Sequence, residues 1–212
     1  MKKKIVRKLL FTLVLLMFAI PVFSMNTQAK AIYTGNKKTD QAVEAIIIRA
    51  CGKKYSTMTN KQKLKASYKY LVKHMTYSHS DGRVKIKPTA AEKKIYAENL
   101  AALKLDKNIT YSKKFKSDWR NVRTMRGTCK DMAGVMCIIA NHLGFKAGYC
   151  HGRYVRSNGS SVDHHWNYIV VNGKKKYCDV QAANDGGHSW SRIKKYYLRS
   201  RSSSFWRKHY RF

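Results

Sequence analysis

Acidic residues are scarce in this 212-residue chain. It contains 11 Asp and Glu against 44 Lys and Arg, and its formal net charge at pH 7 is +33. Such a surface attracts anionic partners, although an exported protein can also carry it simply as a solvated surface. The basic residues are scattered and follow no zinc-finger, ribonucleoprotein or leucine-zipper pattern, so we expect no specific nucleic-acid partner.

The chain also lacks an apolar run long enough to cross a membrane. Leu9–Phe23 spans 15 residues after the basic opening MKKKIVRK, and a spanning helix needs about 20. Small residues at Ser24, Ala29 and Ala31 follow as candidate cleavage points. This pattern predicts a signal peptide over residues 1–31 and a secreted or cell-surface protein with no membrane span after cleavage. A retained membrane anchor is the alternative.

Linker sequences are missing too. The chain has only two prolines, and no proline- or glycine-rich stretch or internal repeat divides residues 32–212. We therefore predict one domain there, with a substantial core, and a monomer. Six of the 44 Lys and Arg and no acid lie in residues 1–31. The predicted domain keeps 38 basic against 11 acidic residues, a net charge of +27.

Cys-x-x-Cys motifs are absent, and the spacing of Cys and His fits no structural zinc pattern, so we expect neither a metal nor a cofactor. The five cysteines are Cys51, Cys129, Cys137, Cys150 and Cys178. An odd number in an exported protein suggests one free thiol beside disulfides. If Cys129 is the free one, the other four allow three pairings, and buried thiols are an equal alternative.

The N-terminal half shows the patterns of four helices. The first has Thr39 or Asp40 as its N-cap, and Thr89 and Glu92 form a capping box for the third. A fourth, shorter helix is expected around Trp119. The second helix presents one apolar face at helical spacing, formed by Leu64, Tyr68, Leu71, Val72 and Met75.

The segment GTCKDMAGVMCIIANHLG is the best-defined element of the sequence. Thr128 and Asp131 predict a capped helix start, with Cys129 at the first helical position. A core stripe follows at Met132, Val135, Met136, Ile139 and Leu143. A helix N-terminus favours the thiolate form of a cysteine, and its free backbone N–H groups can hold an oxyanion. Position alone, however, is modest support for a nucleophile.

A two-residue periodicity replaces the helical pattern in the second half. FKAGYCHGRYV, HHWNYIVV and KKKYCDV read as strands, and Asn172-Gly173 joins the last two as a hairpin. Several helices followed by an antiparallel sheet predict the α+β class, with the helical half packed on the sheet. Residues 181–190, QAANDGGHSW, look flexible enough to form a lid.

The hairpin register suggests which histidine pairs with Asp179. A two-residue turn at 172 and 173 places Gln181 opposite His164 and makes Asp179 the diagonal neighbour of His164 on the same face. His165 points to the other face. Asp179 can then orient the ring of His164. A partly buried structural histidine is the alternative, and a strand bulge would reverse the assignment.

These motifs together resemble the transglutaminase-like superfamily of papain-like fold. Its members show a Gly-x-Cys that opens a helix, a His-Ala-Trp on a strand and an Asp after the next strand. The resemblance covers about residues 119–182 and assigns Cys129 as nucleophile, His164 as catalytic histidine and Asp179 as its acid. Trp166 matches the family Trp. Two departures lie at the expected cleft: His165 replaces a small residue, and Val180-Gln181 replaces Pro-Thr.

The resemblance implies a cysteine enzyme that acts on amide bonds of protein or peptide substrates through a thioester. It leaves open whether water or an amine resolves the thioester, so a protease, an amidase and an acyltransferase are all compatible with it. Trp119 is a weak candidate for the second oxyanion donor. A different class is also open: a non-catalytic cationic module that binds anionic cell-wall or surface polymers.

Overall fold

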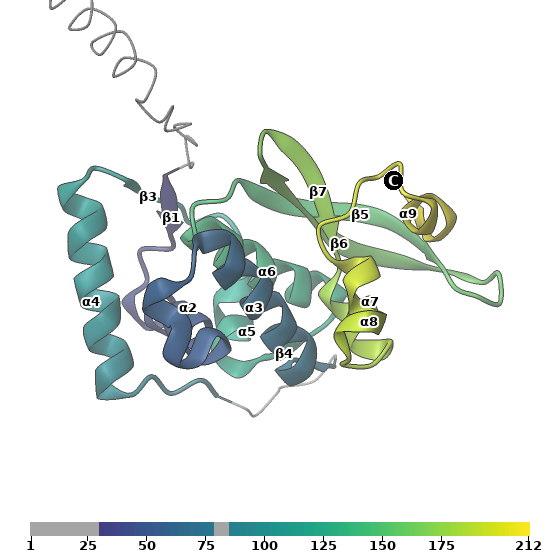
Figure 1. Cartoon of the computed structure of the whole chain (residues 1–212). Helices are drawn as coiled ribbons and strands as arrows, with labels where there is room; N and C mark the ends of the chain where they lie inside the picture. Colours follow the sequence, from purple (N-terminus) through teal and green to yellow (C-terminus); the bar gives the residue numbers. More distant parts are fainter. Residues whose placement is uncertain (1–29, 79–84) are drawn as a thin grey trace, which may run out of the picture.

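The computed structural model describes residues 30–78 and 85–212 (Figure 1). The predicted signal peptide lies outside these ranges except for its last two residues. Ala31 is buried in the first strand, β1 (Ala31–Tyr33), and its backbone N–H donates to the Asn108 carbonyl oxygen at 2.9 Å. Cleavage after Ala31 would remove a residue of β1, whereas cleavage after Ala29 would leave it whole.

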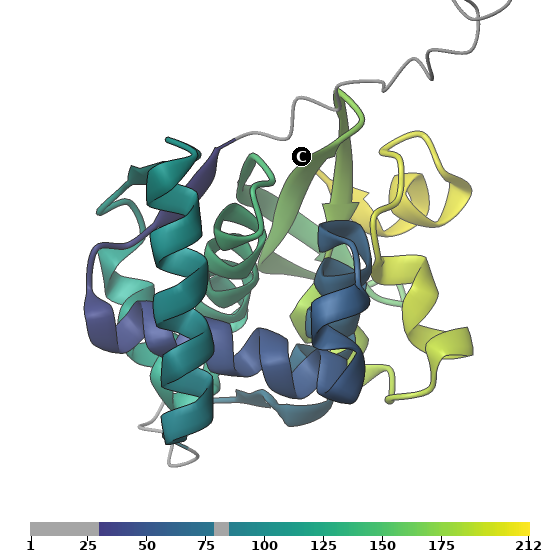
Figure 2. The same cartoon turned by 60° about the vertical axis from the view of Figure 1, so that its left-hand side comes forward.

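The helices of the N-terminal half lie where the apolar periodicity predicts them. They are α2 (Lys37–Cys51), α3 (Asn60–His74), α4 (Ala90–Leu105), α5 (Trp119–Thr124) and α6 (Cys129–His142), with short 3-10 helices at Gly52–Thr57 and Lys116–Asp118. Every residue of the predicted apolar faces of α3 and α6 is buried. The capping boxes predicted for α4 and α6 are present. In Figure 2, α4 lies in front of α2, which it contacts.

The predicted cap of the first helix was wrong. Asn36 is the N-cap of α2, and its side chain accepts from the Thr39 backbone N–H. Asp40 lies inside the helix and turns back to accept from the Thr34 backbone N–H and hydroxyl. Because a buried carboxylate needs such donors, Asp40 fixes the loop that leads from β1 into α2.

A buried acid–base pair joins α2 to α6. Glu44 Oε2 lies 2.8 Å from His142 Nε2, and both side chains are 3% exposed. The Tyr55 hydroxyl also donates to Glu44. Burial raises the pKa of Glu44, but the hydrogen bond and charge of His142, the Tyr55 hydroxyl and Lys63 together lower it by more, so the carboxylate form is favoured. This pair anchors the end of α6 opposite Cys129.

The second half forms a four-stranded antiparallel sheet in the order β7-β6-β5-β8. Its strands are β5 (Ala147–Val155), β6 (Ser161–Val171), β7 (Lys174–Cys178) and the short β8 (Tyr210–Arg211). Two small parallel pairs lie outside it: β1 with β3 (Ile109–Tyr111), and β2 (Thr76–Tyr77) with β4 (Arg126–Gly127). The α+β class and the helical half packed on a small antiparallel sheet are confirmed.

The hairpin has the predicted register as far as β7 extends. Asn167 pairs with Cys178, and Asn172 and Gly173 both have positive φ, as a two-residue turn requires. The strand then ends, because Asp179 caps a helix instead of continuing the sheet. Gln181 was predicted opposite His164; it lies in that helix, so this expectation was wrong.

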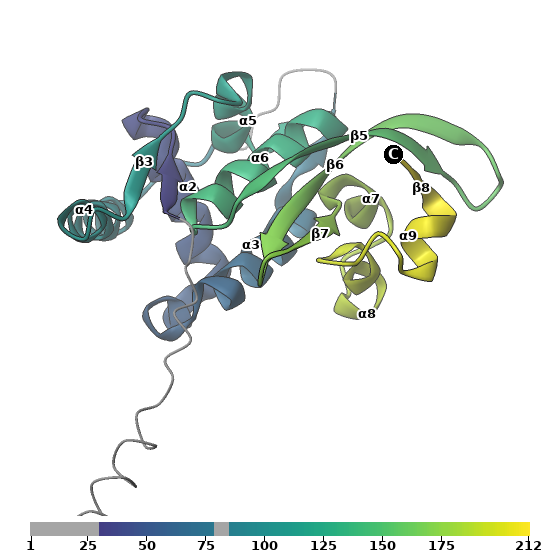
Figure 3. The same cartoon turned by 90° about the horizontal axis from the view of Figure 1, so that it is seen from above.

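The two faces of β6 contact different parts of the molecule. Asn167 is fully buried on one face, and its amide donates to the Ala133 carbonyl oxygen of α6 at 2.7 Å. Trp166 on the other face meets Trp206 edge-on. The sheet therefore lies between the N-terminal helices and the C-terminal segments (Figure 3).

The C-terminal segments are short and well packed. They comprise α7 (Val180–Asp185), α8 (Trp190–Ile193), a 3-10 turn at Lys194–Tyr196 and α9 (Ser204–His209). The expected flexible lid was wrong for its first part, because α7 buries Ala182 and Ala183, and the Asn184 amide donates to the Val72 and Met75 carbonyl oxygens.

All five cysteines are free thiols, and two of them, Cys137 and Cys178, are buried. The alternative of buried thiols therefore holds for these two. Over residues 30–78 and 85–212, no helix is both long enough and apolar enough to span a membrane.

Candidate active site

The Cys129 thiol stands at the first residue of α6, as predicted. Thr128 is the N-cap, and its backbone N–H donates to Asp131 Oδ2 at 2.8 Å. Asp131 also accepts from the Asn121 amide of α5 at 3.0 Å. A Cβ on Gly127 would lie 2.3 Å from the Asp131 Cβ, so this close approach requires the glycine of the Gly-x-Cys motif. The cap thus fixes the orientation of the thiol.

His164 and Asp179 form a buried pair. Nε2 of His164 lies 2.6 Å from Oδ2 of Asp179, and the side chains are 4% and 1% exposed. The contact predicted from the hairpin register is therefore present. Since Nε2 is engaged with Asp179, Nδ1 is the ring nitrogen left for a partner on the other side.

Asp179 is held by two further donors. Oδ1 accepts from the Ala182 backbone N–H at 3.0 Å, which caps α7, and Oδ2 accepts from the Tyr210 hydroxyl at 2.8 Å. Tyr210 is buried and stacks on Trp206, with ring centroids 3.8 Å apart. Sequence reasoning missed Tyr210, because nothing in the tail WRKHYRF indicates that it returns to the sheet as β8.

The buried imidazole of His164 favours its protonated form. Burial lowers the pKa of His164, but the Asp179 carboxylate and the Cys129 thiol raise it by more, to about 10. The ring therefore carries its proton at neutral pH. An imidazolium next to a cysteine favours the thiolate, the nucleophilic form.

His165 approaches the same thiol from the other face of the strand. Its Nδ1 lies 4.0 Å from the Cys129 Sγ. Its ring stacks on that of His151, directly opposite in β5, with centroids 4.5 Å apart. Burial and the neighbouring His151 lower the pKa of His165, so this ring is neutral where His164 is charged. His165 does point to the opposite face, yet it is also a neighbour of Cys129.

Comparison with known proteins now identifies the family. A family model described as the transglutaminase-like superfamily matches residues 87–194, just over half of the chain. The chain belongs to the transglutaminase-like superfamily. The matched region contains Cys129, His164 and Asp179, and it includes the whole segment on which the sequence resemblance was based.

Two solved structures are similar to the chain. One is a TGase, with 16% identity and a TM-score of 0.41; the match covers 67% of this chain and 31% of that one. The other, from Cytophaga hutchinsonii, is provisionally assigned as a cysteine protease, with 13% identity, a TM-score of 0.38 and coverage of 70% and 39%. The chain thus spans about a third of the length of these proteins. No curated protein matches it.

Tyr77 is a candidate site residue that sequence reasoning did not single out. Strand β2 pairs with β4 so that Tyr77 lies beside Gly127, two residues before Cys129. Burial raises the pKa of Tyr77, and the Cys129 thiol and Asp185 raise it further. Trp119, the weak candidate for the oxyanion donor, is half-buried, and among the described residues its Nε1 has no hydrogen-bond partner. Tyr77 is therefore a second candidate for this donor.

A cleft of about 300 Å³ opens at His164. The acid Asp185 and the base Arg156 line it, so it presents both charges. Asp185 also links the cleft to Tyr77, whose pKa it raises. The other lining residues are Tyr154, Ser157, Val162, Gln181, Ala182, Gly186 and Tyr196.

We predict that Cys129 is the fast-alkylating thiol of the native protein. Burial raises the pKa of the other four thiols, that of Cys150 to about 11. At neutral pH, iodoacetamide should label Cys129 at least about tenfold faster than any other cysteine. Mass spectrometry of tryptic peptides over time measures this. Comparable labelling at Cys51 or Cys150 would count against Cys129 as the nucleophile.

Substitution of His164 and of His165 should have different effects on turnover. We predict that His164→Ala lowers turnover of a glutamine-containing peptide by about 10²–10⁴-fold, the usual effect of losing an acid–base group. His165→Ala should leave kcat within about threefold and act mainly on KM, because His165 has no carboxylate partner that orients it as Asp179 orients His164. The opposite ranking would make His165 the partner of Cys129.

Proposed function

We propose that this protein is a secreted cysteine enzyme that cleaves amide bonds in protein or peptide substrates through a thioester. The observation that carries the proposal is the convergence of Cys129 at a helix N-terminus with the buried His164–Asp179 pair. Family membership supports the class of chemistry. The cleft beside His164 is lined by an acid and a base, which suits a polar substrate.

In the first step, the Cys129 thiolate attacks the carbonyl carbon of the scissile amide and its negative charge passes to the carbonyl oxygen. The His164 imidazolium then gives its proton to the leaving nitrogen, which departs as ammonia or an amine. The products of this step are a thioester on Cys129 and a neutral imidazole. Asp179 keeps the ring oriented throughout and stabilises its charged form.

In the second step, the neutral His164 takes a proton from water, and the resulting hydroxide adds to the thioester carbonyl. Collapse of this intermediate releases the carboxylic acid and restores the thiolate–imidazolium pair. In both steps the Cys129 backbone N–H at the start of α6 is one donor to the oxyanion. We assign the Tyr77 hydroxyl as the second donor, because the pairing of β2 with β4 places Tyr77 beside Gly127, two residues before Cys129.

Water is the acceptor that the surroundings of the site favour. Transfer to an amine requires a site that excludes water and positions the amine. The cleft beside His164 is open, and the first part of the segment predicted as a lid instead belongs to the packed helix α7. The strongly basic domain also repels a cationic lysine at long range. We therefore propose a peptidase or amidase on a transglutaminase-like fold.

Product analysis tests this proposal. We predict that a glutamine-containing peptide, incubated with the enzyme and excess cadaverine, yields mainly glutamate or a cleaved peptide. Liquid chromatography with mass spectrometry separates these from the cadaverine conjugate, and Cys129→Ser is the control for background hydrolysis. Predominance of the conjugate at modest amine concentration would establish transfer instead. No product with any peptide of a broad library would favour a non-catalytic role.

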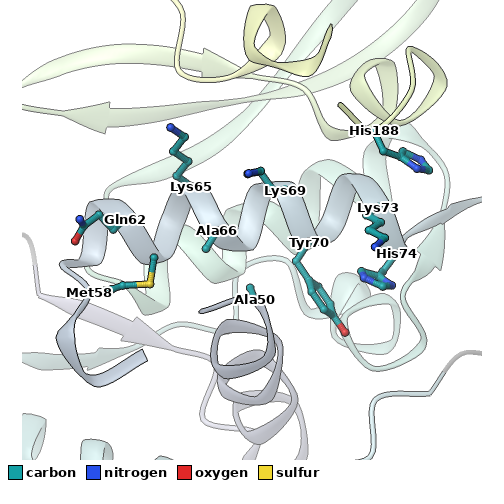
Figure 4. A pocket seen from close by; sticks show the side chains of 10 residues that line it. All are labelled: Ala50, Met58, Gln62, Lys65, Ala66, Lys69, Tyr70, Lys73, His74 and His188. Atoms are coloured by element: carbon teal, nitrogen blue, oxygen red, sulfur yellow. The ribbon is translucent and has the colours of Figure 1, made fainter. Parts of the chain in front are cut away.

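That non-catalytic role has an observation of its own. A cavity of about 440 Å³ lies along α3, and Lys65, Lys69 and Lys73 line it at helical spacing together with His74 and His188 (Figure 4). None of its lining residues is acidic, and none belongs to the proposed triad. The ammonium groups of Lys65 and Lys69 also lie 4.3 and 5.6 Å from the centre of the Trp190 ring.

We propose that this cavity, the α3 basic groove, binds an anionic cell-wall or surface polymer. Polymer binding by this groove would hold the enzyme at its substrate. If the enzyme proposal fails, polymer binding would be the sole function of the protein. Its three lysines follow one helix face, which suits a linear chain of phosphate or carboxylate groups.

We predict that binding of inorganic polyphosphate falls steeply between 0.1 and 1 M salt, since the Debye length shrinks from about 10 to about 3 Å. Changing Lys65, Lys69 and Lys73 to Gln should weaken binding by about 10- to 100-fold. This range assumes that each lysine contributes about 1 kcal/mol or less to the binding free energy. The matched control changes the exposed Lys93, Lys104 and Lys107 to Gln. Fluorescence anisotropy measures both, and equal weakening in the control would reject a localised groove.

A further inference from the structure

Three potential metal ligands gather beside Cys129. His151, Asp163 and His165 each offer one ligand atom, and these atoms all lie within 4.8 Å of one another. Nε2 of His151 lies 2.7 Å from Oδ1 of Asp163, and the His165 ring stacks on that of His151. The proposed triad does not use any of the three.

The sheet itself brings these groups together. His151 of β5 is the direct cross-strand partner of His165 in β6, and Asp163 is two residues before His165, on the same face. Backbone hydrogen bonds therefore set the spacing of the three side chains. His151 and Asp163 are exposed and His165 is half-buried, so an ion can reach them from solvent.

A fourth donor is available from the helix. Cys129 Sγ lies 4.0 Å from Nδ1 of His165. Two imidazoles, a carboxylate and a thiolate are donors of the type that Zn²⁺ prefers, whereas Mg²⁺ and Ca²⁺ take oxygen ligands. Around a tetrahedral zinc ion with bonds of about 2.0–2.3 Å, neighbouring ligand atoms are about 3.3–3.8 Å apart. Binding requires the side chains to rotate to that spacing, since Cys129 is not part of the cluster whose atoms lie within 4.8 Å of one another.

Charge balance also favours a divalent ion at this place. One carboxylate and one thiolate neutralise Zn²⁺, and two neutral imidazoles complete the shell without adding charge. Elsewhere on this strongly basic domain a cation is repelled. His165 stands where the family resemblance has a small residue, so the site is a feature of this chain and not of the superfamily pattern.

We propose that His151, Asp163 and His165 bind Zn²⁺ with the Cys129 thiolate as the fourth ligand, and that the bound ion withholds the nucleophile. The imidazoles coordinate through ring lone pairs. Formation of the Zn–S bond replaces the S–H bond where Cys129 is a thiol, and the proton leaves to solvent. Removing the ion returns Cys129 to His164. Zinc would therefore act as a reversible inhibitor of the site.

The binding test uses the metal alone and needs no substrate, so its outcome is independent of the proposed enzymatic reaction. Zn²⁺ affinity is measured by competition with a chromophoric chelator at neutral pH. We expect one tight site, and affinity at least about 100-fold weaker in His151→Asn and in Asp163→Asn, because each loses a ligand. Both positions are exposed, so circular dichroism should report an unchanged fold. His188→Asn, which changes an exposed histidine outside the cluster, should leave the affinity unchanged.

Two further measurements test the thiol as ligand. Co²⁺ bound in place of Zn²⁺ should show a thiolate-to-cobalt charge-transfer band that is absent in Cys129→Ser. Saturating Zn²⁺ should slow iodoacetamide labelling of Cys129 at least tenfold in the wild type, but not in His151→Asn at the same concentration. The proposal is overturned if His151→Asn binds zinc as tightly as the wild type. It is also overturned if zinc protects Cys129 equally in that variant, since the ion would then sit between Cys129 and His164.

Discussion

The Asp179 carboxylate is the group on which the rest of the site depends. It is 1% exposed, and three donors from different parts of the chain surround it: the His164 ring on β6, the Tyr210 hydroxyl on β8 and the Ala182 backbone N–H in α7. A carboxylate buried this deeply is tolerated only if it is paired and hydrogen-bonded. The hairpin, the first turn of α7 and the C-terminal strand must therefore meet at one point. Their meeting also holds the His164 ring toward Cys129.

Cys129 lies between two histidines of opposite character. His164 is buried against a carboxylate and holds its proton, whereas His165 is half-buried beside another imidazole that lowers its pKa. Consecutive residues of a strand alternate faces, so a thiol at the end of a helix that packs across the strand can contact both. The same sulfur atom can thus serve as a nucleophile activated by a cation or as a ligand shared with a neutral ring. The enzyme proposal and the zinc proposal each use one of these environments.

The basic character of the protein is confined to its surface. Of the acids, Asp40, Glu44, Glu92, Asp118 and Asp179 are buried, and the first three are committed to fixing loops, helices or the helix–sheet scaffold. Few acids are left to offset the lysines outside, which is why the groove along α3 has no acidic lining residue. The shortage of acid noted in the sequence therefore has a structural counterpart. Five of the eleven carboxylates are buried inside the protein, where each has a donor.

Local pattern was enough to predict the helices of the N-terminal half, the cap before Cys129, the hairpin and its register, and the contact of His164 with Asp179. These features depend on residues near one another in the sequence, where periodicity, capping and turn geometry act directly. The resemblance to the transglutaminase-like superfamily was recognised from the same stretches of sequence.

Contacts between distant segments could not be predicted in this way. Tyr210 reaches Asp179 because β8 adds to the far edge of the sheet, and Tyr77 lies beside Gly127 because β2 pairs with β4. His151 meets His165 because β5 pairs with β6 in one of several registers that the sequence allows. The first two contacts depend on which strands pair across long stretches of the chain, and that choice is made by burial of the whole core. The sequence alone thus determined the long helices, the hairpin and the candidate triad residues, while only the tertiary structure decided which other side chains surround them.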